Sequence, residues 1–193
     1  MVVLTFAHKG EAQEFLRRKH NIPVDFHFSG VYRHENELLL LTGAGIENAA
    51  IRLKSILDYF GRKIQLVINL GIGGSLHERW EINQIYGIKK TLRENNPYGE
   101  IYQTRNKRTN IVCVSAERPV ITDDHALKLA RFADVVDLEL WGCAHVSRQY
   151  GIELKAYKLI SDRAGSRTNK AAVKQDAAIY ASHLFDFYKK LSF

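Results

Sequence analysis

The chain has 193 residues, of which 46% are hydrophobic and 25% charged, with a formal net charge of +7. This composition is typical of a globular protein, and the length suits one domain over residues 1–193 while leaving little room for a second. The chain contains only 3 Pro and no repeat or low-complexity tract, which argues against repeat and disordered architectures.

The first half of the chain alternates short apolar runs with amphipathic segments. After the TGAG at 42–45, apolar residues follow the spacing of one helical face as far as Phe60. The run LVINL is typical of a buried strand and is followed by GIGG. We expect strands at 2–7, 25–33, 37–42 and 66–70, and helices at about 11–19 and 46–60.

The second half continues the alternation. Asp123 or Asp124 is a favourable cap for the helix at about 123–133. We expect strands at 83–90, 110–115, 133–137 and 154–161, a helix at 138–150, and one long C-terminal helix. Buried strands that alternate with amphipathic helices predict an α/β fold, a single three-layer domain with a mixed, largely parallel central sheet flanked by helices.

Acidic residues follow several of the predicted strands. In the stretch VVDLELWGCAH, Asp137 and Glu139 lie between two apolar segments, where an unpaired carboxylate is costly to desolvate. Singly, Glu11 could favour a helix dipole, Glu139 could cap a helix and Asp162 could belong to a turn. Ligands bind beyond the carboxyl ends of strands in such folds, so Glu11, Glu139 and Asp162 together favour a binding site.

The glycine-rich segments do not support a dinucleotide site. TGAGIENA has the spacing GxGxxxA, but the next strand ends in Asn69 and Leu70 instead of an acid. GIGGSL has Leu76 at the third glycine position. The simpler interpretation is that these glycines permit tight strand-to-helix turns.

Other catalytic motifs are missing from the sequence. It contains no GxSxG, Walker or HExxH pattern, and its 8 His are scattered. We therefore expect no metal and no cofactor.

The positive charge is concentrated in RRKH at 17–20 and RNKR at 105–108. Neither cluster is interleaved with aromatic residues, so we interpret them as solvent-exposed basic surface and expect no nucleic-acid partner. A basic nucleic-acid-binding domain remains an alternative, and it predicts salt-dependent retention on DNA or RNA.

The cysteines and the N-terminus bear on the cellular compartment. Cys113 and Cys143 lie in apolar stretches without a CxxC pattern and are predicted to be small core residues. MVVLTFAHKG lacks the features of a signal peptide, and the longest apolar run, LLLL at 38–41, is too short to span a bilayer. We expect a cytoplasmic protein without a membrane partner.

Five blocks of the sequence resemble the purine nucleoside phosphorylase and nucleosidase superfamily. The resemblance is greatest to methylthioadenosine/S-adenosylhomocysteine nucleosidase and futalosine hydrolase. The blocks follow the family's order and cover most of the chain: VVLTFAHKGEAQEFL, TGAGIENAA, INLGIGGSL, DLELWGCAHV and LISDRAG.

The resemblance implies a role for each acid. Glu11 would be the general base that activates water, Asp162 would donate a proton to purine N7, and Glu139 would bind the ribose hydroxyls. The implied chemistry requires Asp162 to be held protonated by burial while Glu11 stays a base. The resemblance also implies contacts to substrate from Ser161, which would support Asp162, and from Leu138, Gly73, Gly74, Pro119 and Val120.

The resemblance favours hydrolysis over phosphorolysis. The phosphorylases have an arginine and a serine that hold phosphate, and here Val67 and Ile72 stand near those positions. We expect hydrolysis of a 5′-modified purine nucleoside of the methylthioadenosine, S-adenosylhomocysteine or futalosine type. A phosphate-dependent phosphorylase and a non-catalytic nucleoside-binding relative remain alternatives. The chain is short between Lys90 and Val112, and family members commonly form homodimers.

Overall fold

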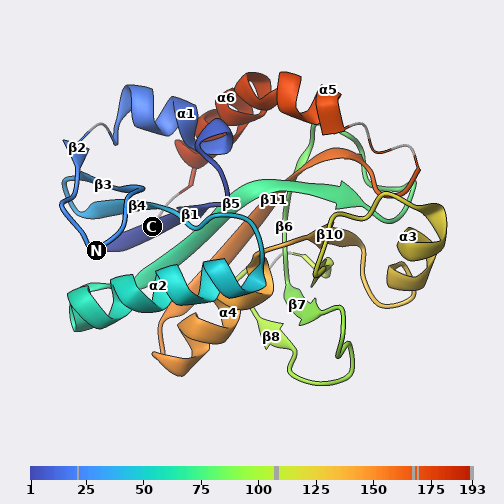
Figure 1. Ribbon diagram of the computed structural model, residues 1–193, viewed down its shortest axis with the longest axis horizontal. Coiled ribbons are helices and arrows are strands. Elements are labelled where there is room, and N and C mark those ends of the chain that lie inside the picture. Colours follow the sequence, from blue (N-terminus) through green and yellow to red (C-terminus); the bar gives the residue numbers. More distant parts are fainter. Residues whose placement is uncertain (21, 107–108, 167, 169, 192–193) are drawn as a thin grey trace.

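The strands form one mixed sheet (Figure 1). The computed structural model describes the chain except residues 21, 107–108, 167, 169 and 192–193. The strands are β1 (Val2–Phe6), β2 (Ile22–Pro23), β3 (Val31–His34), β4 (Glu37–Leu41), β5 (Leu66–Ser75), β6 (Ile85–Gly87), β7 (Lys90–Arg93), β8 (Tyr102–Gln103), β9 (Val112–Ser115), β10 (Val135–Asp137) and β11 (Glu153–Arg163).

The order along the sheet is β2-β3-β4-β1-β5-β10-β9-β7-β8, and β11 pairs with β5 and β6. The pairs β4–β1, β1–β5, β5–β11, β10–β9 and β9–β7 are parallel. The pair β5–β10 and the outer pairs β2–β3, β3–β4, β6–β11 and β7–β8 are antiparallel. The predicted mixed sheet with a largely parallel centre is confirmed.

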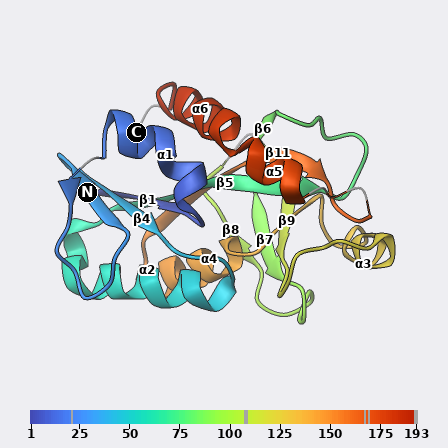
Figure 2. The same ribbon diagram turned by 45° about the horizontal axis from the view of Figure 1, so that its top comes forward.

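Helices cover both faces of the sheet, as predicted. They are α1 (Lys9–Arg18), α2 (Ile46–Phe60), α3 (Asp123–Leu129), α4 (Leu140–Gln149), α5 (Lys170–Gln175) and α6 (Ala177–Tyr188). Helices α1, α5 and α6 lie on one face, α2 and α4 lie on the other, and α3 lies near one end of the sheet (Figures 1 and 2). The result is a three-layer α/β domain.

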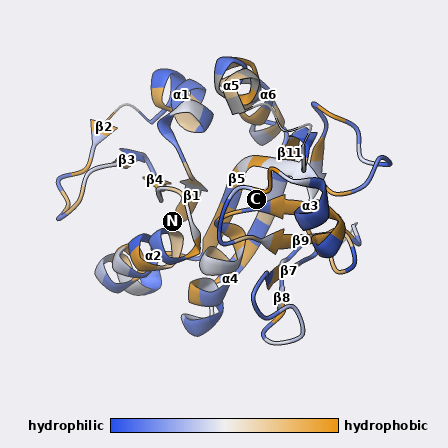
Figure 3. Ribbon diagram, turned by 45° about the vertical axis from the view of Figure 1, so that its right-hand side comes forward, coloured by the Kyte–Doolittle hydropathy of each residue, from blue (hydrophilic) through white to orange (hydrophobic). Residues whose placement is uncertain are grey.

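The core is divided in two by the sheet. Val3 and Leu38 belong to a buried cluster with Leu53 of α2, whereas the neighbouring Leu4 and Leu39 belong to a cluster with α1 and α6. Strands buried on both faces must be apolar at successive positions, which explains runs such as LLLL. Figure 3 shows apolar residues along the central strands and polar residues on α3.

One long strand determines where the site lies. On one edge of β5, β1 pairs with Leu66 to Asn69, and β10 pairs farther along with Gly74 and Ser75. On its other edge, β5 pairs with β11 over almost its full length. Between Asn69 and Gly74, therefore, the first edge of β5 carries no strand among the described residues.

The glycines serve two different purposes. Gly43 and Gly45, with φ of 76° and 98°, make the predicted tight turn before α2. The prediction of a turn at GIGG was wrong, because β5 continues through it to Ser75. A Cβ on Gly73 would lie 2.9 Å from Val135 Cγ1, so the missing side chain permits the close approach of β10.

Several predicted boundaries were also wrong. The strand predicted over 25–33 is confined to Val31–His34, and the C-terminal helix is divided at Asp176. Helix α3 is capped by Thr122 instead of an aspartate, because its hydroxyl accepts a hydrogen bond from the His125 amide at 3.4 Å.

The remaining local predictions had mixed outcomes. Within RRKH, His20 is fully buried, although a solvent-exposed cluster was predicted. Residues 107–108 of RNKR lie outside the described residues. Cys113 and Cys143 are free and buried, as predicted.

Candidate active site

A cavity of about 600 Å³ opens where β5 lacks a neighbour between β1 and β10. All nine residues predicted at the site line this cavity, although they come from widely separated segments. They are Glu11, Gly73, Gly74, Pro119, Val120, Leu138, Glu139, Ser161 and Asp162. Their common location is a finding of the structure, and their individual roles stay predictions.

Glu11 accepts hydrogen bonds from two backbone amides, one just after the end of β1 and one within β5. Its Oε2 accepts a hydrogen bond from the Ala7 amide at 3.1 Å, and its Oε1 accepts one from the Ile72 amide at 3.3 Å. The Ile72 amide is available because it lies on the segment of β5 that no strand pairs on that edge. Glu11 therefore does more than favour the dipole of α1: its 7% exposed side chain is held in one orientation at the cavity.

Glu139 occupies the N-cap position of α4, but its side chain does not cap that helix. Its Oε1 accepts a hydrogen bond from the Gly45 amide, at the start of α2, at 3.0 Å. Burial, followed by the charge of Asp137, raises the pKa of Glu139 to about 8.

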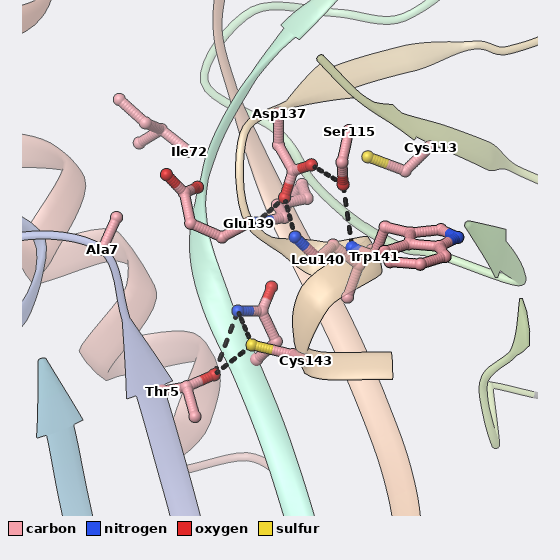
Figure 4. Close-up of polar contacts among 12 residues, drawn as sticks. Thr5, Ala7, Ile72, Cys113, Ser115, Asp137, Glu139, Leu140, Trp141 and Cys143 are labelled. Carbon is pink, nitrogen blue, oxygen red and sulfur yellow. Dashed lines mark hydrogen bonds and ion pairs between the residues drawn. The ribbon is translucent and has the colours of Figure 1, made fainter. Parts of the chain in front are cut away.

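Asp137 caps α4 in place of Glu139 (Figure 4). Its Oδ2 accepts a hydrogen bond from the Leu140 amide at 2.9 Å, and its Oδ1 accepts one from Ser115 Oγ at 2.6 Å. Ser115 Oγ in turn accepts a hydrogen bond from the Trp141 amide at 2.8 Å. The two acids in VVDLELWGCAH thus have different surroundings. Asp137 accepts hydrogen bonds from a side chain and from the start of α4. Glu139 accepts a hydrogen bond from one backbone amide and lines the cavity.

Lys158 is the charged residue near the site that sequence reasoning missed. Its Nζ lies 2.7 Å from Asp137 Oδ2, and its side chain is 2% exposed. Burial lowers its pKa, but the neighbouring Asp137 outweighs burial and raises the pKa above the ordinary value. In LKAYKLIS, Lys158 has the same appearance as an outward-facing polar residue of a strand, so the local sequence offered no signal.

Asp162 lies at an irregularity of β11, where the pairing register with β5 shifts between Ile160 and Asp162. Its Oδ1 accepts a hydrogen bond from Ser161 Oγ at 2.6 Å, which is the contact expected of Ser161. We predicted that Asp162 would be the deeply buried acid. The structure leaves its side chain partly exposed and buries Glu139 more deeply.

The cavity walls are mostly apolar. Pro119, Val120, Val136, Leu138 and Ala164 contribute aliphatic surface, and none of the lining residues that the structure describes is Lys or Arg. Across the described part of the chain, no group of three or more His, Cys, Asp or Glu is arranged to hold a metal ion. No described helix is long and apolar enough to cross a bilayer.

The order of the strands and the helices on both faces of the sheet match the fold of solved nucleosidase structures. Neither a family model nor a curated protein sequence matches the chain. Solved structures do match it.

The matching structures include methylthioadenosine/S-adenosylhomocysteine nucleosidases and a futalosine hydrolase. Native futalosine hydrolase of Helicobacter pylori is 17% identical, with a TM-score of 0.81 over 98% of this chain and 97% of the other. The methylthioadenosine/S-adenosylhomocysteine nucleosidase of H. pylori, with butyl-thio-DADMe-Immucillin-A, is 16% identical, with a TM-score of 0.82 over 97% and 95%. The Neisseria meningitidis nucleosidase, in complex with methylthio-immucillin-A, is 19% identical, with a TM-score of 0.80 over 98% and 99%. The resemblance read from the sequence is confirmed at the level of the fold.

Proposed function

We propose that this protein hydrolyses the N-glycosidic bond of a 5′-modified purine nucleoside and releases the free base. The observation that carries the proposal is the gathering of Glu11, Glu139 and Asp162, from three distant segments, around one cavity of about 600 Å³. A nucleoside fits a cavity of this size and largely apolar character. The structural likeness to nucleosidases supports the same class of reaction.

The charges that develop in the reaction match the acids of the cavity. Breaking the bond builds positive charge on the ribose and negative charge on the departing purine. Glu11 would accept a proton from the attacking water, with its carboxylate oriented by the amides of Ala7 and Ile72. Glu139 would bind the ribose hydroxyls and, once ionised, stabilise the positive ring.

Asp162 would deliver a proton to purine N7 as the bond breaks. The hydroxyl of Ser161, 2.6 Å away, would fix the orientation of its carboxyl group. Pro119, Val120 and Leu138 would contact the base through apolar surface. Proton transfer of this kind typically contributes about 10²- to 10⁴-fold in rate.

Water is a better acceptor than phosphate in this cavity. A phosphate anion is held best by cationic donors, and the described lining includes neither Lys nor Arg. The hydroxyls of Ser161 and Thr168 line the cavity but donate hydrogen bonds to Asp162 and to the Arg163 carbonyl. Ile72 places an aliphatic side chain at the lining position where the phosphorylases have a serine. The carboxylate of Glu11, which would act as the base, would also repel a second anion in the same cavity.

The test is an assay of base release. The protein is incubated with methylthioadenosine, S-adenosylhomocysteine and futalosine, each with and without phosphate, and free adenine or hypoxanthine is measured. We expect release without phosphate from at least one substrate, and Glu11→Gln should reduce it by about 10²-fold or more. Glu14→Gln is the matched control, because Glu14 lies on the same helix and pairs with Arg17 and Arg18.

Other outcomes would identify the alternatives. Release that requires phosphate would indicate a phosphorylase, and tight adenine binding without any product would indicate a non-catalytic relative. Retention on DNA or RNA that weakens with salt would indicate a nucleic-acid-binding domain. We further propose a homodimer, on the resemblance alone, and light scattering of the purified protein tests it.

A further inference from the structure

The segment that follows β11 forms part of the cavity wall and is held from outside the sheet. β11 pairs with β5 as far as Arg163, and the Ala164 amide donates a hydrogen bond to the Ser75 carbonyl at 2.9 Å. After Ala164 the chain leaves the sheet and passes the start of α3 (Figures 1 and 2). There the amides of Gly165 and Ser166 donate to acceptors in the loop before α3 and in α3 itself. The position of these two residues therefore depends on α3 and its loop.

Asp123, the first residue of α3, binds this segment through both of its carboxylate oxygens. Its Oδ1 accepts a hydrogen bond from the Ser166 amide at 2.9 Å, and its Oδ2 accepts one from Ser166 Oγ at 2.7 Å. Hydrogen bonds to a carboxylate are stronger than those between neutral groups. Gly165 permits the approach, because its φ is 118° and a Cβ there would lie 2.5 Å from Asp123 Oδ1.

The same segment is bonded to a residue of the cavity wall. The Gly165 amide donates a hydrogen bond to the Val120 carbonyl at 3.2 Å. Val120 and Ala164 both line the cavity, on either side of this contact. Asp123 therefore lies behind the place where the loop of Val120 meets the chain leaving β11.

The proposed acid of the reaction is held by other contacts. Asp162 pairs with β5 within the sheet, and its carboxyl group accepts a hydrogen bond from Ser161 Oγ at 2.6 Å. The next residue, Arg163, donates to the carbonyl of His77 at 2.9 Å. The position of Asp162 is thus fixed by the sheet and its neighbours, whereas the wall beyond it is fixed by Asp123.

We propose that Asp123 is a positioning residue, which holds the wall formed by Val120 and Ala164 in place for the purine base. It acts through Ser166 and touches no substrate. The purine rests on the proposed function, whereas the effect of Asp123 on the wall can be measured in the empty protein. Because Asp162 is held independently, loss of Asp123 should weaken the binding of substrate and leave the chemical step nearly unchanged.

The first experiment compares Asp123→Ala with Asp124→Ala in the base-release assay. Each variant removes one acid from the first turn of α3, but it is Asp123 that is bonded to Ser166. We expect Asp123→Ala to raise KM about fivefold or more and to keep kcat within about twofold of the wild type. Asp124→Ala should match the wild type in both constants. A merely structural role would lower the fraction of active protein, and so the apparent kcat, without raising KM.

Two further variants test whether the contact with Ser166 is responsible. Asp123→Asn keeps an oxygen that can accept from the Ser166 amide, so it should restore most of the lost affinity. Ser166→Ala removes the hydroxyl but keeps the amide, so it should raise KM less than Asp123→Ala does. In the Asp123→Ala background, Ser166→Ala should have no additional effect, because the bonded partner is already absent.

The second experiment needs no substrate. Amide hydrogen exchange is measured by NMR in the empty, full-length protein. In Asp123→Ala, the Gly165 amide should exchange about fivefold faster or more than in Asp124→Ala, and the central amides of β5 should be unchanged. Binding of adenine, measured by calorimetry, should weaken in parallel with the rise in KM.

Unchanged exchange at Gly165 would overturn the proposal. Equal KM values for Asp123→Ala and Asp124→Ala, or a fall in kcat alone, would overturn it as well. Faster exchange in Asp123→Ala, when the wild type neither releases base nor binds adenine, would support the role of Asp123 in holding the wall and reject the proposed function.

Discussion

Asp137 and Glu139 lie two residues apart, but their carboxyl groups differ in the number of hydrogen-bond and charged partners. Asp137 accepts hydrogen bonds from Ser115 and Leu140 and pairs with Lys158. Glu139 accepts one from the Gly45 amide. A carboxylate with several donors is stable within the fold, whereas one with a single donor in a buried place gains from a ligand that brings more. This difference directs attention to Glu139 as the binding residue.

At the residue scale, the sharpest prediction concerns Asp162. Asp162→Asn preserves the size of the side chain and an oxygen that can accept the hydrogen bond from Ser161. We expect kcat for base release to fall by about 10²- to 10⁴-fold, because an amide cannot donate the proton of a carboxylic acid to the purine. The measurement is kcat under saturating substrate, together with a circular dichroism spectrum that should match the wild type.

Asp124→Asn provides the control, because Asp124 is an exposed acid of α3. Its activity should equal that of the wild type. Turnover by Asp162→Asn close to the wild-type rate would remove the proposed acid role of Asp162.

At the scale of elements, the contact between α2 and α4 sets the position of Glu139. A Cβ on Gly142 of α4 would lie only 2.2 Å from the carbonyl oxygen of Ile46 in α2. The two helices can therefore approach closely only because residue 142 has no side chain. This approach brings the start of α4 near the start of α2, where Glu139 reaches the Gly45 amide.

Gly142→Ala should separate these helices. We expect a loss of about 1–3 kcal/mol or more in the free energy of unfolding, because the added methyl group meets backbone that cannot rotate away. Urea denaturation measures the loss. Gly10→Ala is the matched helical control, since its Cβ would lie 3.4 Å from Ala177 Cβ, and its stability should change little. Equal stability of both variants would contradict the close contact.

At the scale of the whole molecule, Glu37 connects three distant parts of the chain. It lies at the start of β4, and it contacts Lys19 and His20 just after α1 and Tyr188 of α6. Burial alone would raise its pKa, but the contacts with His20, Tyr188 and Lys19 outweigh burial and lower it to about 2. The lowered pKa means that the ionised form stabilises the folded state.

Because the pKa of Glu37 is lowered in the folded state, the stability of the protein should depend on pH. The contribution of Glu37 to the free energy of unfolding should be fully present above its ordinary pKa of 4.5 and be lost as the pH falls toward 2. Glu37→Gln should therefore be less stable than the wild type at pH 7, and the difference should shrink below pH 4.5. Thermal unfolding across this pH range measures it. Glu81→Gln, at an exposed position, is the control and should show no such difference. A difference in stability between Glu37→Gln and the wild type that does not vary with pH would contradict the explanation.

The sequence was sufficient for the order of the main elements and for the shared location of the predicted site residues. Apolar runs such as LVINL predicted buried strands, and the parallel centre followed from their alternation with helices. Short strands such as β7 and β8 were missed, because polar segments of two to four residues carry little periodic signal. Lys158 was missed because its partner Asp137 is 21 positions away, and only tertiary packing brings them together.

The edge of β5 between Asn69 and Gly74, which pairs with no strand of the described chain, affects how the ligand specificity of this protein could evolve. The opening is made by main chain and strand order, so it persists whichever side chains surround it. Ile72 lines that opening, and its replacement by smaller or polar residues should vary ligand preference while leaving the architecture intact. New specificities could therefore arise at this position by single substitutions, without rebuilding the sheet.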